Sequence, residues 1–555
     1  MKLKKAKKGS AMIELLFELI IISTLIFGFI VMFPPFITNL KLTFCTKEIV
    51  RSIEVSGSVK ENEVEEIVDK LLEKNGLNKD NVQNLNISYN PSSIHTCGTH
   101  RNSDKKLKMR SSFTVTYEYP ITLPIYSPSL KKEDQKQYTK DLPIIKIKAS
   151  DEVVFPLKQH IGAPCQPIVK VKDEIKVGQV IACSDAFVSS PIISSVSGVV
   201  KKIEERMDVS GKIQESIVIA NDGLYQKVEN NNNKQELTYE EKIERIKAAG
   251  IVGLGGAGFP THVKLSVKDS NQVQYYIVNG AECEPYLTSD YRLMLEKTDE
   301  LIAGIHVLLE MFPKALCYIA IEDNKKEAIH LLKEKCKDEK RIAVKELKTK
   351  YPQGGERMLV KVLTGKTLNS KMLPLDVGCI VDNVATVIAI NQAVRYNQPL
   401  ISKVMTISGD GITPSNIEVP IGTSFKWIVE QLGGFKSEVQ KLICGGPMMG
   451  SALIHLDIPV TKTSSSLLAL VQDEVSLFEP SACIRCGRCK DVCPSLLVPQ
   501  KLYQIATKND TEAFILNGGM ECIECGCCSY TCPAKRNMTQ AFKKMKYLVS
   551  INKRK

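Results

Sequence analysis

Two short runs near the C-terminus, CIRCGRCKDVCP (483–494) and CIECGCCSYTCP (522–533), decide how the last part of this chain folds. In each run, two residues separate the first three cysteines from one another, three residues separate the third from the fourth, and proline follows the fourth. A loop with two residues between thiols can wrap one iron–sulfur cube and present three sulfurs to three irons, so this spacing is typical of a [4Fe–4S] cluster. The doubled run predicts two such clusters.

The fourth cysteine of each run is too far along the chain to close its own cube, and in two-cluster ferredoxins it binds the other cluster. We therefore expect one cluster on Cys483, Cys486, Cys489 and Cys532, and the second on Cys522, Cys525, Cys528 and Cys493. Cys527 is surplus to both clusters. Gly487 and Gly526 lie inside the loops, where we expect the backbone to curl so closely that a side chain would obstruct it.

Zinc, free thiols and disulfides are the alternatives for these cysteines. Zinc ribbons use two CxxC pairs and not two runs of four, while disulfides rarely persist in a reducing compartment. Half of the 18 cysteines lie between residues 483 and 532, and the others follow no pairing rhythm. This distribution indicates metal ligands in one region and reduced, buried thiols elsewhere.

The composition is that of a globular protein with several domains, because 43% of the 555 residues are apolar and 25% are charged. Much of the net charge of +12 comes from lysines in the first eight residues and from a basic tail that begins at Lys543. An apolar segment follows the first lysines directly. This arrangement favours a membrane over a nucleic acid as the partner.

Residues 11–33 are almost wholly apolar, long enough to span a bilayer as a helix, and end at Pro34-Pro35. A secretory signal peptide is the alternative, but no small-residue cleavage site follows the apolar core. The stretch KKGSAMIELL (7–16) resembles the processing site of type IV prepilins and TadE-like pseudopilins. Lysines before the helix predict a C-terminus outside the cell, in conflict with cytoplasmic redox chemistry. We give the clusters more weight and expect the redox domains on the cytoplasmic side of the cell membrane.

Between residues 111 and 203 the sequence predicts short strands, and we assign no functional site to them. SSFTVTYEY (111–119) alternates as a strand does, in an otherwise polar segment. From residue 141 onward, short β runs are broken by glycine and proline, and SSPIISSVSGVVKKI (189–203) resembles the second half of a lipoyl-domain hammerhead. His160 and Cys165 fit either a redox pair or a packed imidazole beside a buried thiol, and we favour the second interpretation.

The stretch GIVGLGGAGFPTHVKLS (250–266) has a loop crowded with Gly253, Gly255, Gly256 and Gly258, directly before a predicted helix. Such a loop lets backbone amides approach a phosphate closely. The next strand, QYYIVNG (274–280), places Asn279, Glu282 and Glu284 at its carboxyl end, where open α/β sheets bind their ligands. YPQGGERMLVKVLTG (351–365) and CIVDNVATVIAI (379–390) again set polar residues beside apolar runs.

A family resemblance rests on GGAGFPTHVKL (255–265), VNGAECEPYLTSDYRLM (278–294), YPQGGER (351–357) and VDNVAT (381–386). These stretches resemble the NADH- and FMN-binding subunit of respiratory complex I and, more closely, the C subunit of Rnf electron-transport complexes, RnfC. The resemblance extends from about residue 141 to 546 and includes the doubled cysteine run. The RnfC-like protein associated with proline reductase and the cobalamin reductases share the same plan.

The resemblance implies a role for each matching position. Gly253, Gly255, Gly256 and Lys264 would hold the FMN phosphate and ring edge; Asn279, Asp382, Asn383 and Thr386 would line the rest of the flavin pocket; Glu282, Tyr351, Gly354 and Glu356 would receive NADH. One position departs from the pattern. The complex I loop carries an arginine where this loop has Val252 and Leu254, so phosphate binding would depend on backbone amides and Lys264.

The expected fold is a multidomain α/β and α+β protein. We expect a basic start with a transmembrane helix (1–40), a polar β-containing segment (41–140), a small β hammerhead-like domain (141–235), an FMN/NADH-binding α/β domain (236–400), a β-grasp domain (401–460) and a helical, ferredoxin-like two-cluster domain with a basic tail (461–555). For the β-grasp domain we expect a packing role alone.

The resemblance implies an electron-transfer subunit that passes electrons from NADH through FMN and two [4Fe–4S] clusters to a protein acceptor, in an Rnf-type or proline-reductase-type system. Its partners would be that acceptor or other subunits of a membrane redox complex, and no nucleic acid. No nucleophile or general base stands out, so the cofactors would carry the chemistry. The alternatives are an iron–sulfur relay or cobalamin-reductase-like protein without its own NADH oxidation, and a membrane-anchored structural fusion.

Overall fold

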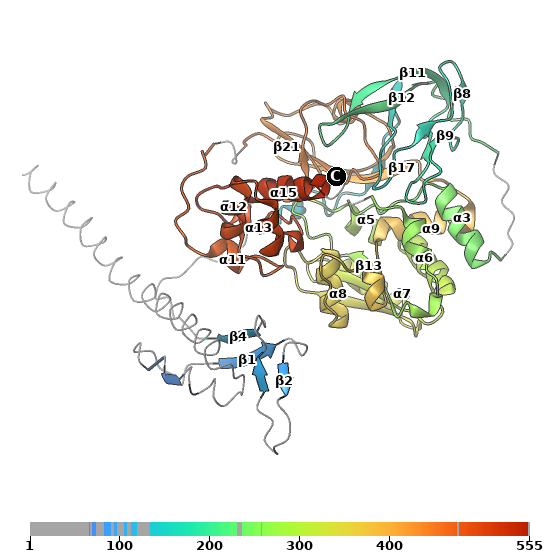
Figure 1. Cartoon of the computed structure of the whole chain (residues 1–555). Helices are drawn as coiled ribbons and strands as arrows, with labels where there is room; N and C mark the ends of the chain where they lie inside the picture. Colours follow the sequence, from blue (N-terminus) through green and yellow to red (C-terminus); the bar gives the residue numbers. More distant parts are fainter. Residues whose placement is uncertain are drawn as a thin grey trace, which may run out of the picture. The chain divides into compact units, whose positions relative to one another are not determined.

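The computed structural model describes residues 134–229, 236–256, 258–473 and 477–552, with short pieces between residues 66 and 118. The chain divides into two compact units, Met1–Lys132 and Glu133–Lys555 (Figure 1). In the first unit, β1 (Gln83–Tyr89) pairs antiparallel with β4 (Phe113–Glu118), and β2 (Ile94–Thr96) with β3 (Lys105–Leu107). β4 lies in the stretch whose alternation predicts a strand.

The predicted membrane-spanning segment at 11–33 and the pseudopilin-like start lie outside the described residues. Of the helices that are described, none is long and apolar enough to cross a bilayer.

The second unit begins with two small antiparallel sheets. The first has four strands in the order β6 (Glu152–Pro156), β12 (Ile213–Asn221), β11 (Gly198–Met207), β8 (Glu174–Ile175). The second has three strands in the order β10 (Ile192–Ile193), β9 (Val180–Cys183), β7 (Gln166–Pro167). Gly198 has φ 147°, and a Cβ there would lie 1.9 Å from the carbonyl oxygen of Ala220. The start of β11 therefore requires glycine.

A parallel sheet of four strands forms the centre of the unit. Its order is β15 (Ile342–Leu347), β14 (Leu316–Glu322), β13 (Tyr275–Gly280), β16 (Cys379–Asn383). The chain moves outward from β13 to β15 and then returns to the other side of β13, so the strand order reverses between β13 and β16. Open α/β sheets bind ligands beyond the carboxyl ends of the strands at such a reversal.

Helices cover both faces of this sheet. They are α3 (Tyr239–Ala248), α4 (Thr261–Leu265), α5 (Ser289–Glu296), α6 (Thr298–Met311), α7 (Lys326–Lys335), α8 (Glu356–Thr364) and α9 (Val384–Tyr396). Tyr276 and Val278 of β13 share a core with α6 and α9, whereas Ile277, on the opposite face, packs with Leu359 of α8. Burial on both faces is usual for parallel strands.

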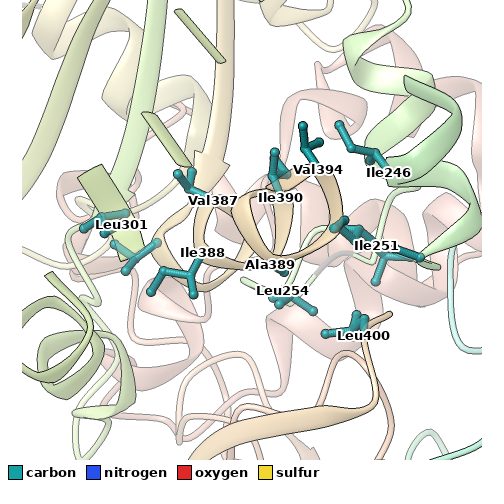
Figure 2. Close-up of a cluster of buried hydrophobic side chains, with 14 of the residues drawn as sticks. Ile246, Ile251, Leu254, Leu301, Val387, Ile388, Ala389, Ile390, Val394 and Leu400 are labelled. Atoms are coloured by element: carbon teal, nitrogen blue, oxygen red, sulfur yellow. The ribbon is translucent and has the colours of Figure 1, made fainter. Parts of the chain in front are cut away.

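The glycine-rich loop is anchored in this core by its two large side chains. Val252 is fully buried and Leu254 is 5% exposed. Figure 2 shows Leu254 near Ala389 of α9 and Leu400. Val252 and Leu254, the two positions at which the loop departs from the expected arginine, are therefore core positions.

A fourth sheet of the unit has six strands, in the order β20 (Ser451–Ala452), β19 (Lys441–Cys444), β21 (Ser466–Leu470), β17 (Ser402–Ser408), β18 (Ser415–Pro420), β5 (Ile144–Lys146). A β17–β18 hairpin, helix α10 (Phe425–Gln431) and a last strand, β21, parallel to β17 make a β-grasp arrangement. The sheet extends beyond the predicted end at residue 460, to β21. It also includes β5, from a segment that the sequence assigns to the hammerhead-like domain.

The C-terminal part is helical, as its sequence predicts. It contains α11 (Arg488–Asp491), α12 (Pro499–Thr507), α13 (Thr511–Leu516), α14 (Cys527–Tyr530) and α15 (Met538–Asn552). Phe514, Phe542 and Met545 are buried in its core, beside Cys528. The described residues of the unit also include short 3-10 helices at Lys136–Tyr138, Ser270–Gln272, Pro374–Val377 and, within the C-terminal part, Gly519–Glu521.

Candidate functional site

Two hollows in the C-terminal part are lined by cysteine sulfurs. The lining of the first includes Cys483, Cys486, Cys489 and Cys532, and that of the second includes Cys493, Cys522, Cys525, Cys527 and Cys528. Each hollow takes its thiols from both runs, as the crossed assignment requires. Cys527, surplus by the sequence pattern, also lines the second hollow.

The two cysteine loops repeat the same backbone conformation. Arg485 and Glu524, in equivalent positions, have φ 57° and 60°, and Gly487 and Gly526 have φ 78° and 81°. Amides point at sulfur in both runs: Arg485 N–H donates to Cys483 Sγ and Glu524 N–H to Cys522 Sγ, each at 3.4 Å. Hydrogen bonds of this kind stabilise cluster thiolates and tune their potential.

The donor set of these hollows fits iron–sulfur cubes. Soft thiolates select Fe–S clusters or zinc, and cysteines dominate the candidate ligands of both hollows; the Glu524 carboxylate, which also lines the second, accepts from Lys546 at 2.6 Å. Among the described residues, no three His, Cys, Asp or Glu side chains lie close enough to share a single metal ion. The thiols are instead distributed around the wall of each hollow.

Polar side chains gather where β13 and β16 end. Asn279 and Asn383 are paired residues of the two strands, and Asp382 precedes Asn383. Asn279 donates to the carbonyl oxygen of Gly354 at 2.9 Å. The Asn383 side chain accepts a hydrogen bond from the Ala385 N–H, in the first turn of α9, and donates one to the Asp290 carboxylate at 2.6 Å. These residues mark the edge of the sheet where its strand order reverses.

Lys264 is held in a buried ion pair at this edge. Its ammonium donates to the carbonyl oxygen of Val381 at 2.7 Å and to Asp382 at 2.9 Å. Asp382 is buried and also accepts from the Tyr276 hydroxyl. Burial alone would lower the pKa of Lys264, but the Asp382 and Glu356 carboxylates outweigh it and raise that pKa. Lys264 is therefore a charged but already paired cation, which places more of the phosphate-binding task on the glycine-rich loop.

The glycine-rich loop exposes its backbone at Gly255 and Gly256. Leu254 N–H donates to Thr386 Oγ1 at 2.9 Å, while the Leu254 side chain is buried in the core. Gly256 has φ 124° and open space where a Cβ would lie, and a Cβ on Gly255 would be 3.2 Å from Asn383. Within the described residues, the amides of Gly255 and Gly256 have no hydrogen-bond acceptor. Outward amides on a glycine loop are what a phosphate requires.

The predicted NADH-binding residues lie close to this edge. One of them, Glu282, already has hydrogen-bond partners within the protein, which the sequence could not show. Glu282 accepts from the amides of Asp290 at 2.7 Å and Tyr291 at 3.2 Å, so its carboxylate caps the start of α5. Glu356 is the first residue of α8 and its side chain is exposed. Gly354 N–H lies 3.3 Å from the thiol of Cys283.

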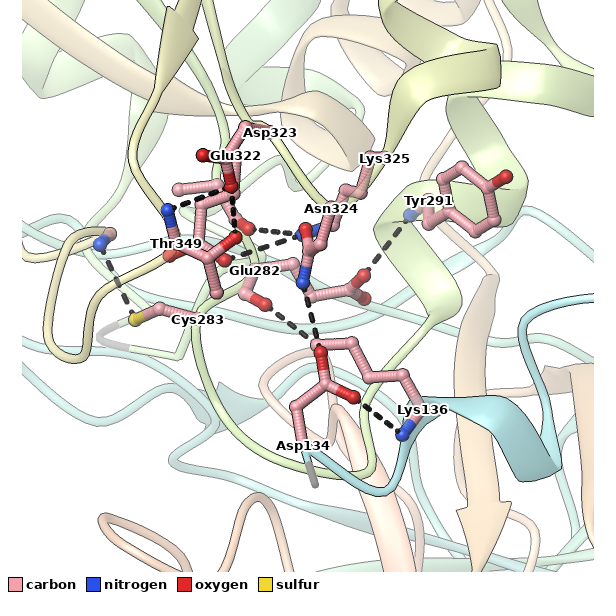
Figure 3. Close-up of polar contacts among 12 residues, drawn as sticks. Asp134, Lys136, Glu282, Cys283, Tyr291, Glu322, Asp323, Asn324, Lys325 and Thr349 are labelled. Atoms are coloured by element: carbon pink, nitrogen blue, oxygen red, sulfur yellow. Dashed lines mark hydrogen bonds and ion pairs between the residues drawn. The ribbon is translucent and has the colours of Figure 1, made fainter. Parts of the chain in front are cut away.

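Two buried lysines hold the loop between β13 and α5, and neither was found from the sequence. Lys136 donates to the carbonyl oxygen of Glu282 at 2.8 Å (Figure 3). It also donates to the carbonyl oxygens of Glu284 at 2.9 Å and of Leu287. Lys325 donates to Ala281 O at 2.6 Å. Burial lowers the pKa of Lys136. No local pattern could have revealed Lys136, because it lies 146 residues from Glu282 in sequence.

The sheet edge and the second cysteine hollow are joined through Glu284 and Tyr351. The Glu284 carboxylate accepts from the amides of Met448 at 3.1 Å and Met449 at 3.0 Å, and lies 3.3 Å from the Tyr351 hydroxyl. That hydroxyl donates to the carbonyl oxygen of Cys525 at 2.8 Å. The second hollow therefore lies next to the edge where β13 and β16 end.

His160 and Cys165 are buried beside the same short segment. His160 Nε2 lies 3.1 Å from Ser189 Oγ and from Ser190 N, and Cys165 Sγ lies 3.2 Å from Ser190 O. Burial lowers the pKa of His160 to about 4 and raises that of Cys165. A neutral imidazole near a protonated thiol agrees with a packing role.

Family models match three parts of this chain. Residues 128–224 match the RnfC barrel sandwich hybrid domain, residues 246–392 the Nuo51 FMN-binding domain, and residues 476–533 a 4Fe–4S dicluster domain. The first match includes the two small sheets, the second includes β13 to β16 with the glycine-rich loop, and the third contains both cysteine runs. The chain thus contains an FMN-binding domain and a dicluster domain.

Several curated proteins are similar over most of the second unit. The C subunit of the proton-translocating ferredoxin:NAD(+) oxidoreductase complex of Clostridium ljungdahlii is 47% identical over 382 residues, 68% of this chain and 83% of that protein. The C subunit of the Na(+)-translocating complex of Acetobacterium woodii is 39% identical over 425 residues, 76% of this chain and 96% of that protein. The C subunit of the ion-translocating oxidoreductase complex of Pseudomonas aeruginosa is 38% identical over 389 residues, 68% of this chain and 50% of that protein. A solved NAD+-reducing [NiFe]-hydrogenase aligns with a TM-score of 0.40 and 19% identity, over 50% of this chain and 55% of that one.

Proposed function

This chain belongs to the RnfC family, the C subunits of ion-translocating oxidoreductase complexes, and from that premise we propose that it transfers electrons between NADH and a protein partner by way of FMN and two [4Fe–4S] clusters. When bound, the flavin exchanges two electrons with the nicotinamide and single electrons with the clusters. The relatives are named as subunits of ferredoxin:NAD(+) oxidoreductases, which supports nicotinamide as one redox partner. The acceptor is then another subunit of the same membrane complex, or a protein that docks on it.

In this proposal the residues of the chain bind and orient the flavin and the nucleotide, and they exclude water from the site. The outward amides of Gly255 and Gly256 hold the phosphate, and Asn279 and Asn383 line the flavin at the edge of the sheet. Glu356 and Tyr351 border the place where the nucleotide enters. Because electron transfer needs no nucleophile or general base, we assign no catalytic acid or base.

One observation carries the proposal: the Tyr351 hydroxyl donates to the carbonyl oxygen of Cys525 at 2.8 Å. This contact joins the FMN-binding domain directly to a residue of the second cysteine hollow. It supports a path in which the cluster on Cys493, Cys522, Cys525 and Cys528 exchanges electrons with the flavin first. The cluster on Cys483, Cys486, Cys489 and Cys532 then faces the protein partner, and Cys486 is exposed.

The test is the cofactor content and the NADH response of the full chain, purified without oxygen. We expect about eight irons and one flavin per chain, and bleaching of the flavin absorbance when NADH is added. A preparation with full clusters but no flavin response would favour the alternative of a relay without its own NADH oxidation. A colourless preparation without iron would exclude both.

We infer that the chain associates with the membrane through the other subunits of its complex. The membrane-spanning segment predicted at residues 11–33 is a separate proposal about the same attachment. Extraction of membranes at high salt separates the two, because peripheral attachment is released and a spanning helix is not.

A further inference from the structure

Two lysines of the β-grasp region are buried behind the glycine-rich loop. Lys403, on β17, is 4% exposed, and Lys462, between β20 and β21, is 1% exposed. Lysines are almost never fully buried unless they are paired. Their position therefore calls for a reason beyond packing.

Both ammonium groups bind the loop through its carbonyl oxygens. Lys462 donates to Gly250 O at 2.7 Å, to Pro191 O at 2.7 Å and to Ser190 Oγ at 3.2 Å. Lys403 donates to Leu254 O at 2.8 Å. Carbonyls drawn to one side of a loop leave its amides to face the other side, where Gly255 and Gly256 lie.

The loop is shaped around these contacts at both of its ends. Gly250 has φ 67°, and a Cβ there would lie 2.9 Å from the ammonium nitrogen of Lys462. Gly258 has φ 65°, and a Cβ there would lie 2.7 Å from Thr463. A side chain at either glycine would displace the β-grasp segment from the loop, while the centre of the loop at Gly256 stays open.

The charges of the two lysines are poorly compensated inside the protein. In the part of the chain that the structure describes, Lys462 makes no ion pair, and its partners are neutral oxygens. The negative charge of Asp290 partly offsets the effect of burial on the pKa of Lys403, but the Asp290 carboxylate accepts its hydrogen bond from Asn383. A buried cation with neutral partners is costly. An anion on the outer face of the loop would reduce that cost.

We propose that the β-grasp domain is part of the phosphate site: Lys403 and Lys462 are positioning residues that hold the glycine-rich loop from behind and supply the positive charge for an anionic phosphate. The segment from Gly250 to Pro260 contains no charged residue of its own. This inference rests on the proposed function, in which FMN binds at the loop. Charges act strongly over short distances in a low-dielectric interior, so direct contact with the phosphate is not required.

The test compares FMN with riboflavin, which lacks the phosphate, on flavin-free full-length protein. In Lys462→Gln and Lys403→Gln, the glutamine amide can still donate to a carbonyl, but the charge is gone. We expect FMN affinity to fall on the order of tenfold in each variant, with riboflavin affinity unchanged. Lys426→Gln, on an exposed lysine of α10, is the matched control and should bind both flavins as the unmodified chain does.

The possible outcomes separate this inference from the function on which it rests. If the unmodified chain binds no FMN, both are overturned. If it binds FMN and the two variants bind it equally well, this inference alone is overturned. Equal losses for FMN and riboflavin also overturn it, because they would show that the lysines support the loop without acting on the phosphate.

A measurement on the unmodified chain keeps the proposal testable if the variants do not fold. Burial lowers the pKa of Lys462 to about 7 and that of Lys403 to about 8. Lys462 faces Cys165 and His160, and Lys403 faces Asp290 and Cys444. The ratio of FMN to riboflavin affinity should fall from about pH 6.5 to about pH 9 as the lysines lose their protons. The fall should persist in Asp290→Asn, and a flat ratio would refute the proposal.

Discussion

At the scale of single residues, the two cysteine loops share a conformation but not an environment. Gly487 and Gly526 both require a positive φ, yet a Cβ on Gly487 would meet no atom within 4 Å. A Cβ on Gly526 would lie 2.8 Å from the carbonyl oxygen of Met448. Among the protein's own atoms, the crowding expected at both glycines is found at Gly526, whereas Gly487 lines the first hollow and requires glycine by its backbone conformation.

Gly526→Ala should consequently disturb the protein more than Gly487→Ala. Each variant has the cost of a left-handed alanine, about 1–2 kcal/mol, but Gly526→Ala must also move the backbone at Met448. We expect normal iron content in Gly487→Ala at a slightly lower melting temperature, and clear loss of iron from the second hollow in Gly526→Ala. Equal behaviour of the two variants would show that the contact with Met448 has no importance.

The cysteines themselves allow a matched test of the ligand assignment. Cys486→Ala should remove one of the two clusters, with about half of the iron and of the brown absorbance. Cys527→Ala is the control, since it changes a thiol of the second hollow that the spacing leaves surplus. Iron and sulfide analysis of protein purified without oxygen measures both. Loss of a cluster in Cys527→Ala would mean that the second run uses a different set of thiols.

At the scale of elements, the sequence predicts what depends on local pattern and misses what depends on distant pairing. The glycine-rich loop, the strand before Asn279 and the helices around the cysteine runs follow from composition and periodicity. The place of β5 beside β18 does not, because more than 260 residues separate the paired strands. Lys136, Lys403 and Lys462 were missed for the same reason. A lone lysine carries no signal of the carbonyls that it will meet.

The loop between β13 and α5 shows how much such a lysine can determine. Glu282 and Tyr286 have φ 45° and 69°, which non-glycine residues rarely adopt. Lys136 binds the carbonyl oxygens of three residues in this loop and fixes that conformation. Through the loop it sets the position of Glu284, which reaches the backbone of Met448 and Met449.

Lys136→Met should therefore destabilise the loop and weaken nucleotide binding together. Removing a buried donor from several carbonyls costs about 1–3 kcal/mol for each group left unsatisfied, and we expect a loss of about 2–4 kcal/mol in total because some carbonyls will find water. Denaturant unfolding measures the stability, and titration with NADH measures the affinity. Lys140→Met, four residues on and exposed, should change neither. Stability equal to that of the control would show that the loop holds its shape without Lys136.

At the scale of the second unit, the FMN-binding domain meets the dicluster domain through a few polar contacts. Arg357 of α8 pairs with Glu521 at 3.0 Å, and Ser370 donates to the same carboxylate at 2.5 Å. Glu521 directly precedes Cys522, a predicted ligand of the second cluster. The Tyr351 hydroxyl contacts Cys525, another residue that lines this hollow. Electron transfer between flavin and cluster depends on how firmly these contacts hold the distance.

Weakening the Arg357–Glu521 pair should slow electron transfer without changing the reaction with NADH. The pair is partly exposed, so it is worth about 1 kcal/mol or less, and we expect Arg357→Gln and Glu521→Gln each to slow cluster reduction roughly two- to fivefold. Rapid mixing with NADH separates bleaching of the flavin, which should keep its rate, from bleaching of the clusters.

The double variant distinguishes a direct contact from two independent effects. If Arg357 and Glu521 act through each other, Arg357→Gln combined with Glu521→Gln should be no slower than either change alone. Lys361→Gln, an exposed position one turn further along α8, controls for the lost charge and should leave both phases unchanged. Additive slowing, or slower bleaching of the flavin itself, would mean that this pair does not set the distance between the FMN-binding domain and the second cluster.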